Sequence, residues 1–208
     1  MTRLLFIKGS PRGNASQSNK VAQAYLAARQ RAVPGLIVDE LDIWQEPLPE
    51  FDGDKAEAKM TVITGGELAG AGRTAWDEIT EIAQRFTSAD EYLFTVPMWN
   101  YSIPYRLKLY IDIINQPGLL FGFDPATGYS GLLRNKRATS VFTSGVYAQG
   151  AAPQYGQDFH STYFNEWLRS IGIEDITSLR FQPTLLNADP AATLAAAMAE
   201  AEAAAARI

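Results

Sequence analysis

Apolar residues along this chain form short continuous runs, separated by longer stretches in which they recur at helical spacing. The runs predict β-strands at residues 3–8, 36–43, 91–96, 138–143 and 176–181. The stretches between them predict α-helices at residues 18–31, 54–60, 74–85, 103–114, 159–171 and 190–208. Strands that alternate with helices predict an α/β fold, a doubly wound five-stranded parallel sheet with helices on both faces. We expect residues 1–208 to form a single domain.

Two loops stand where such a fold binds its ligands. In an open parallel sheet, ligands lie outside the carboxyl ends of the strands, at the point where the strand order reverses. Residues 9–18 follow the first strand, and residues 97–101 follow the third. The strand at 36–43 alternates apolar and acidic positions, which is typical of a place near the sheet edge. In one common order of doubly wound sheets the reversal lies between the first and third strands, so both loops face one crevice.

The first loop has the composition of an anion site. It contains hydroxyls, an amide and an arginine directly before a predicted helix; the candidates are Ser10, Arg12, Ser16, Gln17 and Ser18. The first N–H groups of a helix lack intrahelical partners and lie at the positive end of its dipole, so a phosphate is stabilised there. The alternative is an ordinary turn with a serine N-cap. The Gly-Lys-Ser/Thr ending of a nucleoside triphosphate loop is absent.

The second loop suits a flat ring. Pro97 ends the third strand, and Met98, Trp99, Asn100 and Tyr101 follow it. Thioether and aromatic side chains cover the apolar face of a heteroaromatic cofactor, while an amide and loop N–H groups bond its polar edge. Taken alone, Trp99 is as well explained by core packing.

The amino-acid composition excludes several kinds of reactive or metal site. The chain has 208 residues, of which 47% are hydrophobic and 20% charged, and a net charge of -5. It has no cysteine and one histidine, His160, so disulfides, thiolate nucleophiles, iron–sulfur clusters and multi-histidine metal sites are excluded, and no metal site is expected. The acidic balance argues against nucleic-acid binding, and no run approaches the roughly 20 apolar residues of a membrane span. We expect a cytoplasmic protein whose partners are small molecules.

Two further segments carry open interpretations. Residues 116–134 exceed the roughly 12–15 residues of an ordinary loop and are rich in aromatic side chains, which predicts a covering flap, a fold-back onto the same subunit or a partner contact. We interpret His160 as a helix-surface residue, with proton donation to a substrate as a weaker hypothesis. A Ser–His–Asp hydrolase is disfavoured, because the chain lacks Gly-x-Ser-x-Gly.

Together these motifs resemble the FMN-dependent NADH:quinone oxidoreductases, or azoreductases, of flavodoxin-like fold. The resemblance rests on residues 9–12 with 16–18, on residues 97–101, and on Thr143-Ser144-Gly145. It implies bound FMN, NADH or NADPH as electron donor, reduction of quinones and azo compounds by a ping-pong mechanism, and no catalytic side chain, because the flavin carries the chemistry. The alternative is a flavodoxin-like electron carrier that does not oxidise NAD(P)H itself.

The resemblance also assigns the remaining site residues. FMN would contact Ser144, Gly145 and Val146, and Phe121 and Phe159 would wall the substrate pocket of a homodimer. Here the chain departs from the family, which commonly has Gly-Gly where this sequence has Gly145-Val146. Since valine tolerates a positive φ badly, either the backbone is rearranged or Val146 packs over the ring.

Overall fold

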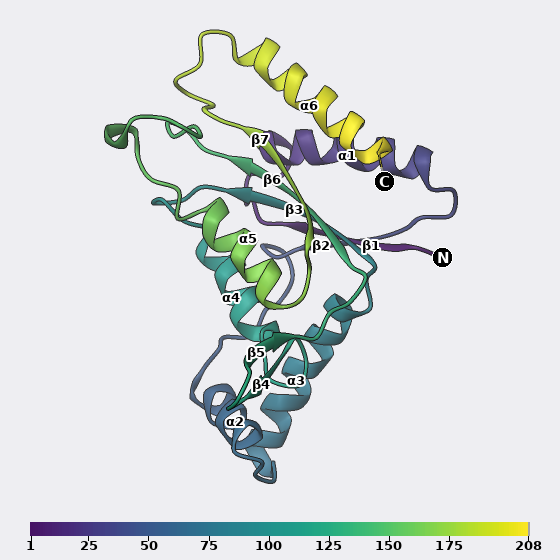
Figure 1. Cartoon of the computed structure of the whole chain (residues 1–208), viewed down its shortest axis with the longest axis vertical. Helices are drawn as coiled ribbons and strands as arrows, with labels where there is room; N and C mark the ends of the chain where they lie inside the picture. Colours follow the sequence, from purple (N-terminus) through teal and green to yellow (C-terminus); the bar gives the residue numbers. More distant parts are fainter. Residues whose placement is uncertain (208) are drawn as a thin grey trace.

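The computed structural model describes residues 1–207, and its centre is a five-stranded parallel sheet (Figure 1). The strand order is β2-β1-β3-β6-β7. The strands are β1 (Arg3–Lys8), β2 (Ile37–Asp42), β3 (Glu91–Pro97), β6 (Arg137–Thr143) and β7 (Asp175–Phe181). The predicted fold class is therefore confirmed. The order reverses between β1 and β3, as expected, and β2 is an edge strand.

Helices cover both faces of the sheet (Figure 1). On one face lie α1 (Gln17–Ala32) and α6 (Pro190–Ala206), and on the other lie α3 (Gly70–Thr87), α4 (Tyr105–Ile114) and α5 (Ser161–Ser170). The short α2 (Gly53–Ile63) packs on α3. Two 3-10 turns complete the list, η1 (Gly13–Ala15) and η2 (Pro153–Tyr155). The predicted helix 190–208 extends by Ile208 beyond the described residues.

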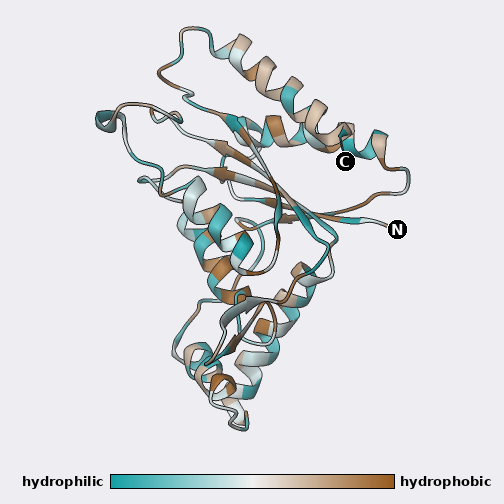
Figure 2. Cartoon of the chain, viewed as in Figure 1, coloured by the Kyte–Doolittle hydropathy of each residue, from teal (hydrophilic) through white to brown (hydrophobic). Residues whose placement is uncertain are grey.

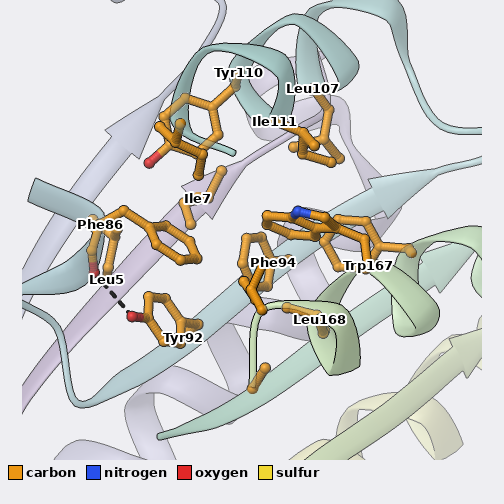
Figure 3. Packing of buried hydrophobic residues seen from close by; sticks show 14 of the residues in the cluster. Leu5, Ile7, Phe86, Tyr92, Phe94, Leu107, Tyr110, Ile111, Trp167 and Leu168 are labelled. Atoms are coloured by element: carbon orange, nitrogen blue, oxygen red, sulfur yellow. Dashed lines mark hydrogen bonds between the residues drawn. The ribbon is translucent and has the colours of Figure 1, made fainter. Parts of the chain in front are cut away.

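The side chains of β1 show why the strands read as continuous apolar runs. Leu4 and Phe6 pack toward α1 and α6, whereas Leu5 and Ile7 pack toward α3 and α4. Successive strand residues point to opposite faces, so a strand covered on both faces is apolar throughout. Figure 2 shows hydrophobic colouring along the central strands, and Figure 3 shows the cluster around Phe94, in which the Tyr92 hydroxyl donates to the Phe86 carbonyl oxygen at 2.9 Å.

One ion pair is buried at the amino end of β3. The Arg29 Nε of α1 donates to a carboxylate oxygen of Glu91 at 2.9 Å, and its Nη1 donates to the Ala205 carbonyl oxygen of α6 at 3.3 Å. Both charged side chains are almost fully buried. A buried charge is tolerated only when paired, so this pair ties α1, α6 and the central strand together.

Residues 116–134 form an antiparallel hairpin outside the main sheet, β4 (Phe121–Asp124) and β5 (Gly128–Gly131). Its base folds back onto the same subunit, since Leu120 and Leu133 are buried in the main core. Phe123 and Tyr129 remain exposed. In Figure 1 the hairpin lies beside α2 and α3, away from the loops that follow β3 and β6.

No helix within residues 1–207 combines the length and apolar character needed to cross a bilayer.

Candidate functional site

The first loop presents an open helix end surrounded by hydroxyls. Ser16 is the N-cap of α1, and its Oγ accepts the Asn19 N–H at 3.2 Å. The Ser16 and Ser18 hydroxyls are 3.0 Å apart and buried. The N–H groups of Gln17 and Ser18, the first two of the helix, have no intrahelical acceptor. Ser10 is buried as well, so the loop offers several neutral donors to one anion.

Gly9 holds this loop against the neighbouring strand. Its N–H donates to the Thr95 carbonyl oxygen at 3.1 Å and to the Thr95 Oγ1 at 3.0 Å. A Cβ at position 9 would lie 2.3 Å from the same carbonyl oxygen. Only glycine fits this approach, because real Cβ atoms do not come so near a backbone oxygen.

The second loop is a tight turn with strained backbone. Trp99 and Ser102 exchange backbone hydrogen bonds of 2.8 and 2.9 Å, and the two residues between them, Asn100 and Tyr101, have φ of 47° and 71°. Such left-handed conformations cost on the order of 1 kcal/mol for a residue with a side chain. Met98 precedes the turn and donates its N–H to the Thr143 carbonyl oxygen at 2.7 Å. The loop is therefore fixed to β6.

The loop after β6 holds Val146 without a positive φ. Neither Gly145 nor Val146 is among the described residues with positive φ, and Val146 is 43% exposed. The backbone at Val146 therefore has a conformation that valine adopts without strain. The Ser144 hydroxyl closes the turn by donating to the Tyr147 carbonyl oxygen. The Leu185 N–H, from the loop after β7, donates to the Gly145 carbonyl oxygen at 2.8 Å.

These loops enclose one cavity of about 240 Å³ at the carboxyl edge of the sheet. Its lining includes most of the predicted cofactor residues, namely Ser10, Arg12, Ser16, Gln17, Ser18, Pro97, Met98, Trp99, Ser144 and Gly145. Arg12 is the one charged residue in the lining. An anion here would be bound mainly by N–H groups, hydroxyls and a helix end, as is common for phosphates.

Other predicted residues lie elsewhere. Asn100 lines a neighbouring cavity of about 480 Å³, which shares the Trp99 wall with the first. Tyr101 and Val146 line neither cavity. Phe121 lines a separate cavity of about 320 Å³ beside the hairpin, and Phe159 is 58% exposed. Within one chain, Phe121 and the loop cavity are thus parts of different surfaces.

The sequence reasoning missed Thr184 and Leu185, which complete the lining from the end of β7. The rule that ligands lie beyond the carboxyl ends of the strands applies equally to the last strand. Residues that follow 176–181 were therefore candidates by position, although their residue types gave no chemical signal.

Comparison with known proteins identifies the family. A profile of proteins described as having a flavodoxin-like fold matches residues 2–205. An FMN-dependent NADH:quinone oxidoreductase of Ruegeria pomeroyi is 55% identical over 192 residues, which cover 92% of this chain and 94% of the relative. The chain belongs to the FMN-dependent NADH:quinone oxidoreductase family.

A second relative and a solved structure are also similar to this chain. An FMN-dependent NADH:quinone oxidoreductase of Desulfotalea psychrophila is 43% identical over 187 residues, 90% of this chain and 88% of the relative. An FMN-dependent NADH-azoreductase of Bacillus anthracis, solved in complex with FMN, has a TM-score of 0.86 at 27% identity, covering 100% of this chain and 99% of that chain. The resemblance inferred from the sequence motifs is confirmed.

The cavity of this NADH:quinone oxidoreductase family member fits an FMN molecule in the chemistry of its lining. The Ser16 and Ser18 hydroxyls and the open end of α1 match a phosphate. Met98 and Trp99 provide thioether and aromatic surface at the other side of the same lining. Within residues 1–207, no group of three or more His, Cys, Asp or Glu residues is placed to hold a metal ion.

His160 is not a surface residue, and that interpretation is wrong. It is fully buried at the N-cap of α5, with its ring 5.0 Å from that of Phe142. Its Nε2–H donates to the Val96 carbonyl oxygen at 2.7 Å, at the end of β3. Burial lowers its pKa to about 4, against the opposing effects of that hydrogen bond and of Asp158. The imidazole is buried and its Nε2–H is already bonded to a carbonyl oxygen of the chain, which disfavours proton donation to a substrate.

Asp158 fixes the start of α5 next to this histidine. One carboxylate oxygen accepts the Ser161 N–H at 2.6 Å and the His160 N–H at 3.1 Å. Burial works to raise the Asp158 pKa, but the hydrogen bonds from Ser161, together with the nearby His160 and Arg180, outweigh it, so the pKa lies below its usual value. Asp158 stays ionised and stabilises the helix end.

Proposed function

We propose that this chain is an oxidoreductase that binds FMN and uses it to carry reducing equivalents from NADH to quinones. The observation that carries the proposal is a cavity at the strand-order reversal whose lining joins the open end of α1 to Met98 and Trp99. The names of the relatives, FMN-dependent NADH:quinone oxidoreductase, support it.

The chain's own groups supply binding and orientation. We expect Ser10, Arg12, Ser16, Gln17 and Ser18 to hold the phosphate. Pro97, Met98 and Trp99, with Ser144 and Gly145, would border the rest of the cofactor. Bound FMN supplies the hydride and electron transfer that protein side chains cannot perform. The backbone hydrogen bonds of Gly9 and of the Trp99–Ser102 turn fix the two loops that line the site.

Donor and acceptor use the site in turn under this proposal. NADH binds, gives up a hydride and leaves as NAD⁺. A quinone then takes its place and leaves as a hydroquinone, after accepting the two electrons and the proton of that hydride and a second proton from solvent. The open cavity of about 480 Å³ beside Trp99 provides room for a flat acceptor. We include aromatic azo compounds among the acceptors, because the B. anthracis structure is that of an azoreductase. Parallel lines in double-reciprocal plots support this ping-pong order, and intersecting lines contradict it.

We further propose a homodimer. Large apolar side chains near the cavities are exposed, among them Tyr105 (65%) and Leu185 (75%), and Tyr129 on the hairpin is 76% exposed. Monomers rarely leave such surfaces uncovered. A second copy would bring Phe121 of its hairpin toward the side of the site where Phe159 lies. A molar mass of one chain by light scattering at micromolar concentration would contradict the dimer.

We place the reaction in the cytoplasm, where NADH is available as a reductant. Cell fractionation that recovers the protein elsewhere would contradict this.

The deciding experiment is the visible absorption spectrum of the purified protein after FMN addition and desalting, followed by anaerobic NADH and then a quinone. Loss of flavin absorbance and its return on quinone addition support the proposal. Retained flavin that neither NADH nor NADPH bleaches, but a partner reductase does, favours the electron carrier instead. Protein that retains no flavin refutes both.

A matched pair of variants tests the phosphate site. Ser16→Ala removes the N-cap acceptor and one hydroxyl of the cavity, and we expect about tenfold weaker FMN binding. Ser88→Ala changes an exposed serine at the end of α3 and should leave FMN binding as in the unaltered protein. Equal affinities in the two variants would remove Ser16 from the site.

A further inference from the structure

Trp44, just beyond β2, touches both halves of the proposed FMN site without lining the cavity. Its indole Nε1–H donates to the Gly9 carbonyl oxygen at 3.1 Å. Gly9 precedes Ser10, the first residue of the anion loop, and its N–H is already bonded to Thr95 of β3. The backbone at the start of this loop is therefore held by hydrogen bonds on both sides, from β3 and from the β2 loop.

The rings around Trp44 belong to the second loop and to the first residue of α4. The Trp44 ring lies 5.6 Å from the Trp99 ring at an angle of 44°, and 5.5 Å from the Tyr105 ring, edge to face. Both separations are within the range of favourable aromatic pairs. Trp99 lines both the 240 Å³ cavity and its 480 Å³ neighbour, so the indole of Trp44 sets the position of a shared wall.

Trp44 is itself firmly placed. Its N–H donates to the Asp42 carboxylate at 3.0 Å. Arg106 of α4 donates through Nε to the Ile43 carbonyl oxygen and through Nη2 to the Glu46 carbonyl oxygen, the latter at 2.8 Å. Carbonyl groups on both sides of the tryptophan are thus bonded to α4, the helix that follows the second loop.

We infer that Trp44 is a positioning residue. It sets the spacing between the first loop (residues 9–18, the anion loop) and the second loop (residues 97–101), so that FMN can be bound by its phosphate and by its flat ring at the same time. The inference rests on the proposed function and adds to it a residue outside the cavity. Its physical basis is preorganisation, since two subsites held at the right separation bind a two-part ligand better than either part alone.

The test compares FMN with riboflavin, which has the same ring and no phosphate. Trp44→Phe keeps an aromatic ring and removes the N–H that bonds Gly9. In the full-length protein, we expect FMN binding, followed by quenching of flavin fluorescence, to weaken about tenfold, as for loss of one buried hydrogen bond. Riboflavin binding should change less than about threefold, because it does not use the anion loop. The preference for FMN over riboflavin therefore shrinks.

The control is Trp76→Phe, the same substitution at a partly buried tryptophan of α3 that lines neither cavity. It should leave both affinities unchanged. If Trp44→Phe is too unstable to titrate, Arg106→Met replaces it, because this change keeps the indole side chain but removes the bonds from α4 that hold its backbone. We expect the same selective loss of FMN affinity.

The outcomes distinguish failure of the positioning role from failure of the proposed function. A Trp44→Phe protein with unaltered FMN affinity overturns it, and so does one in which FMN and riboflavin weaken equally, since that is the mark of general loosening. An unaltered protein that does not bind FMN refutes the proposed function, and this inference with it. A shrunken FMN preference in Trp44→Phe, absent from Trp76→Phe, supports the positioning role.

Discussion

Replacing His160 with glutamine should remove most of the dependence of folding stability on pH between about 6.5 and 4. The imidazole is buried against Phe142, and its Nε2–H is bonded to the Val96 carbonyl oxygen at 2.7 Å. The nearby charged groups are Asp158 and Arg180. The sequence contains this histidine alone, so no other imidazole titrates in the same range.

The sign follows from where the proton binds. Burial lowers the His160 pKa from its ordinary 6.5 to about 4 in the folded chain. Between these values the unfolded chain takes up a proton that the folded chain does not. The free energy of unfolding therefore falls as the pH falls, by about 1.4 kcal/mol per pH unit and about 3 kcal/mol across the window. The lowered pKa of Asp158 acts below this window.

Urea unfolding at pH 7.5 and pH 5.0 measures the effect. Because helices from both ends of the chain pack on one sheet, we propose that residues 1–208 unfold as one domain, in a single transition. The unaltered protein should lose about 2 kcal/mol between the two pH values. His160→Gln, whose amide can still donate to Val96, should lose less than about 0.5 kcal/mol. Equal losses in the two proteins would refute the reasoning, as would an unaltered protein whose stability does not change.

Two other substitutions test single contacts. Gly9→Ala puts a Cβ 2.3 Å from the Thr95 carbonyl oxygen, so we expect a loss of about 1–3 kcal/mol in unfolding free energy and weaker FMN binding. The control is Gly53→Ala, in open space at the start of α2, and equal melting temperatures of the two variants would contradict the steric argument. Glu91→Gln leaves the Arg29 charge buried without its carboxylate, which should cost about 3–5 kcal/mol and lower Tm by roughly 10 °C in thermal unfolding. A change below about 1 kcal/mol would show that the pair is not buried in solution.

The order of strands and helices was open to prediction because it depends on neighbours in the sequence. A strand covered on both faces must be apolar at every position, as at residues 3–8 and 91–96, and a surface helix must repeat its apolar positions every three or four residues. The predicted elements agree with the structure to within a few residues at their ends. The two loops of the cavity followed from this order, since parallel strands place their carboxyl ends at one edge.

What the sequence could not determine depends on contacts between residues far apart in the chain. Thr184 and Leu185 reach the cavity only because β7 lies beside β6. His160 is buried because the N-cap of α5 packs onto the end of β3, 64 positions earlier. Trp44 meets Gly9 across 35 positions. Local patterning specifies which face of an element is apolar, but which side chains meet across a sheet edge is decided by packing of the complete fold.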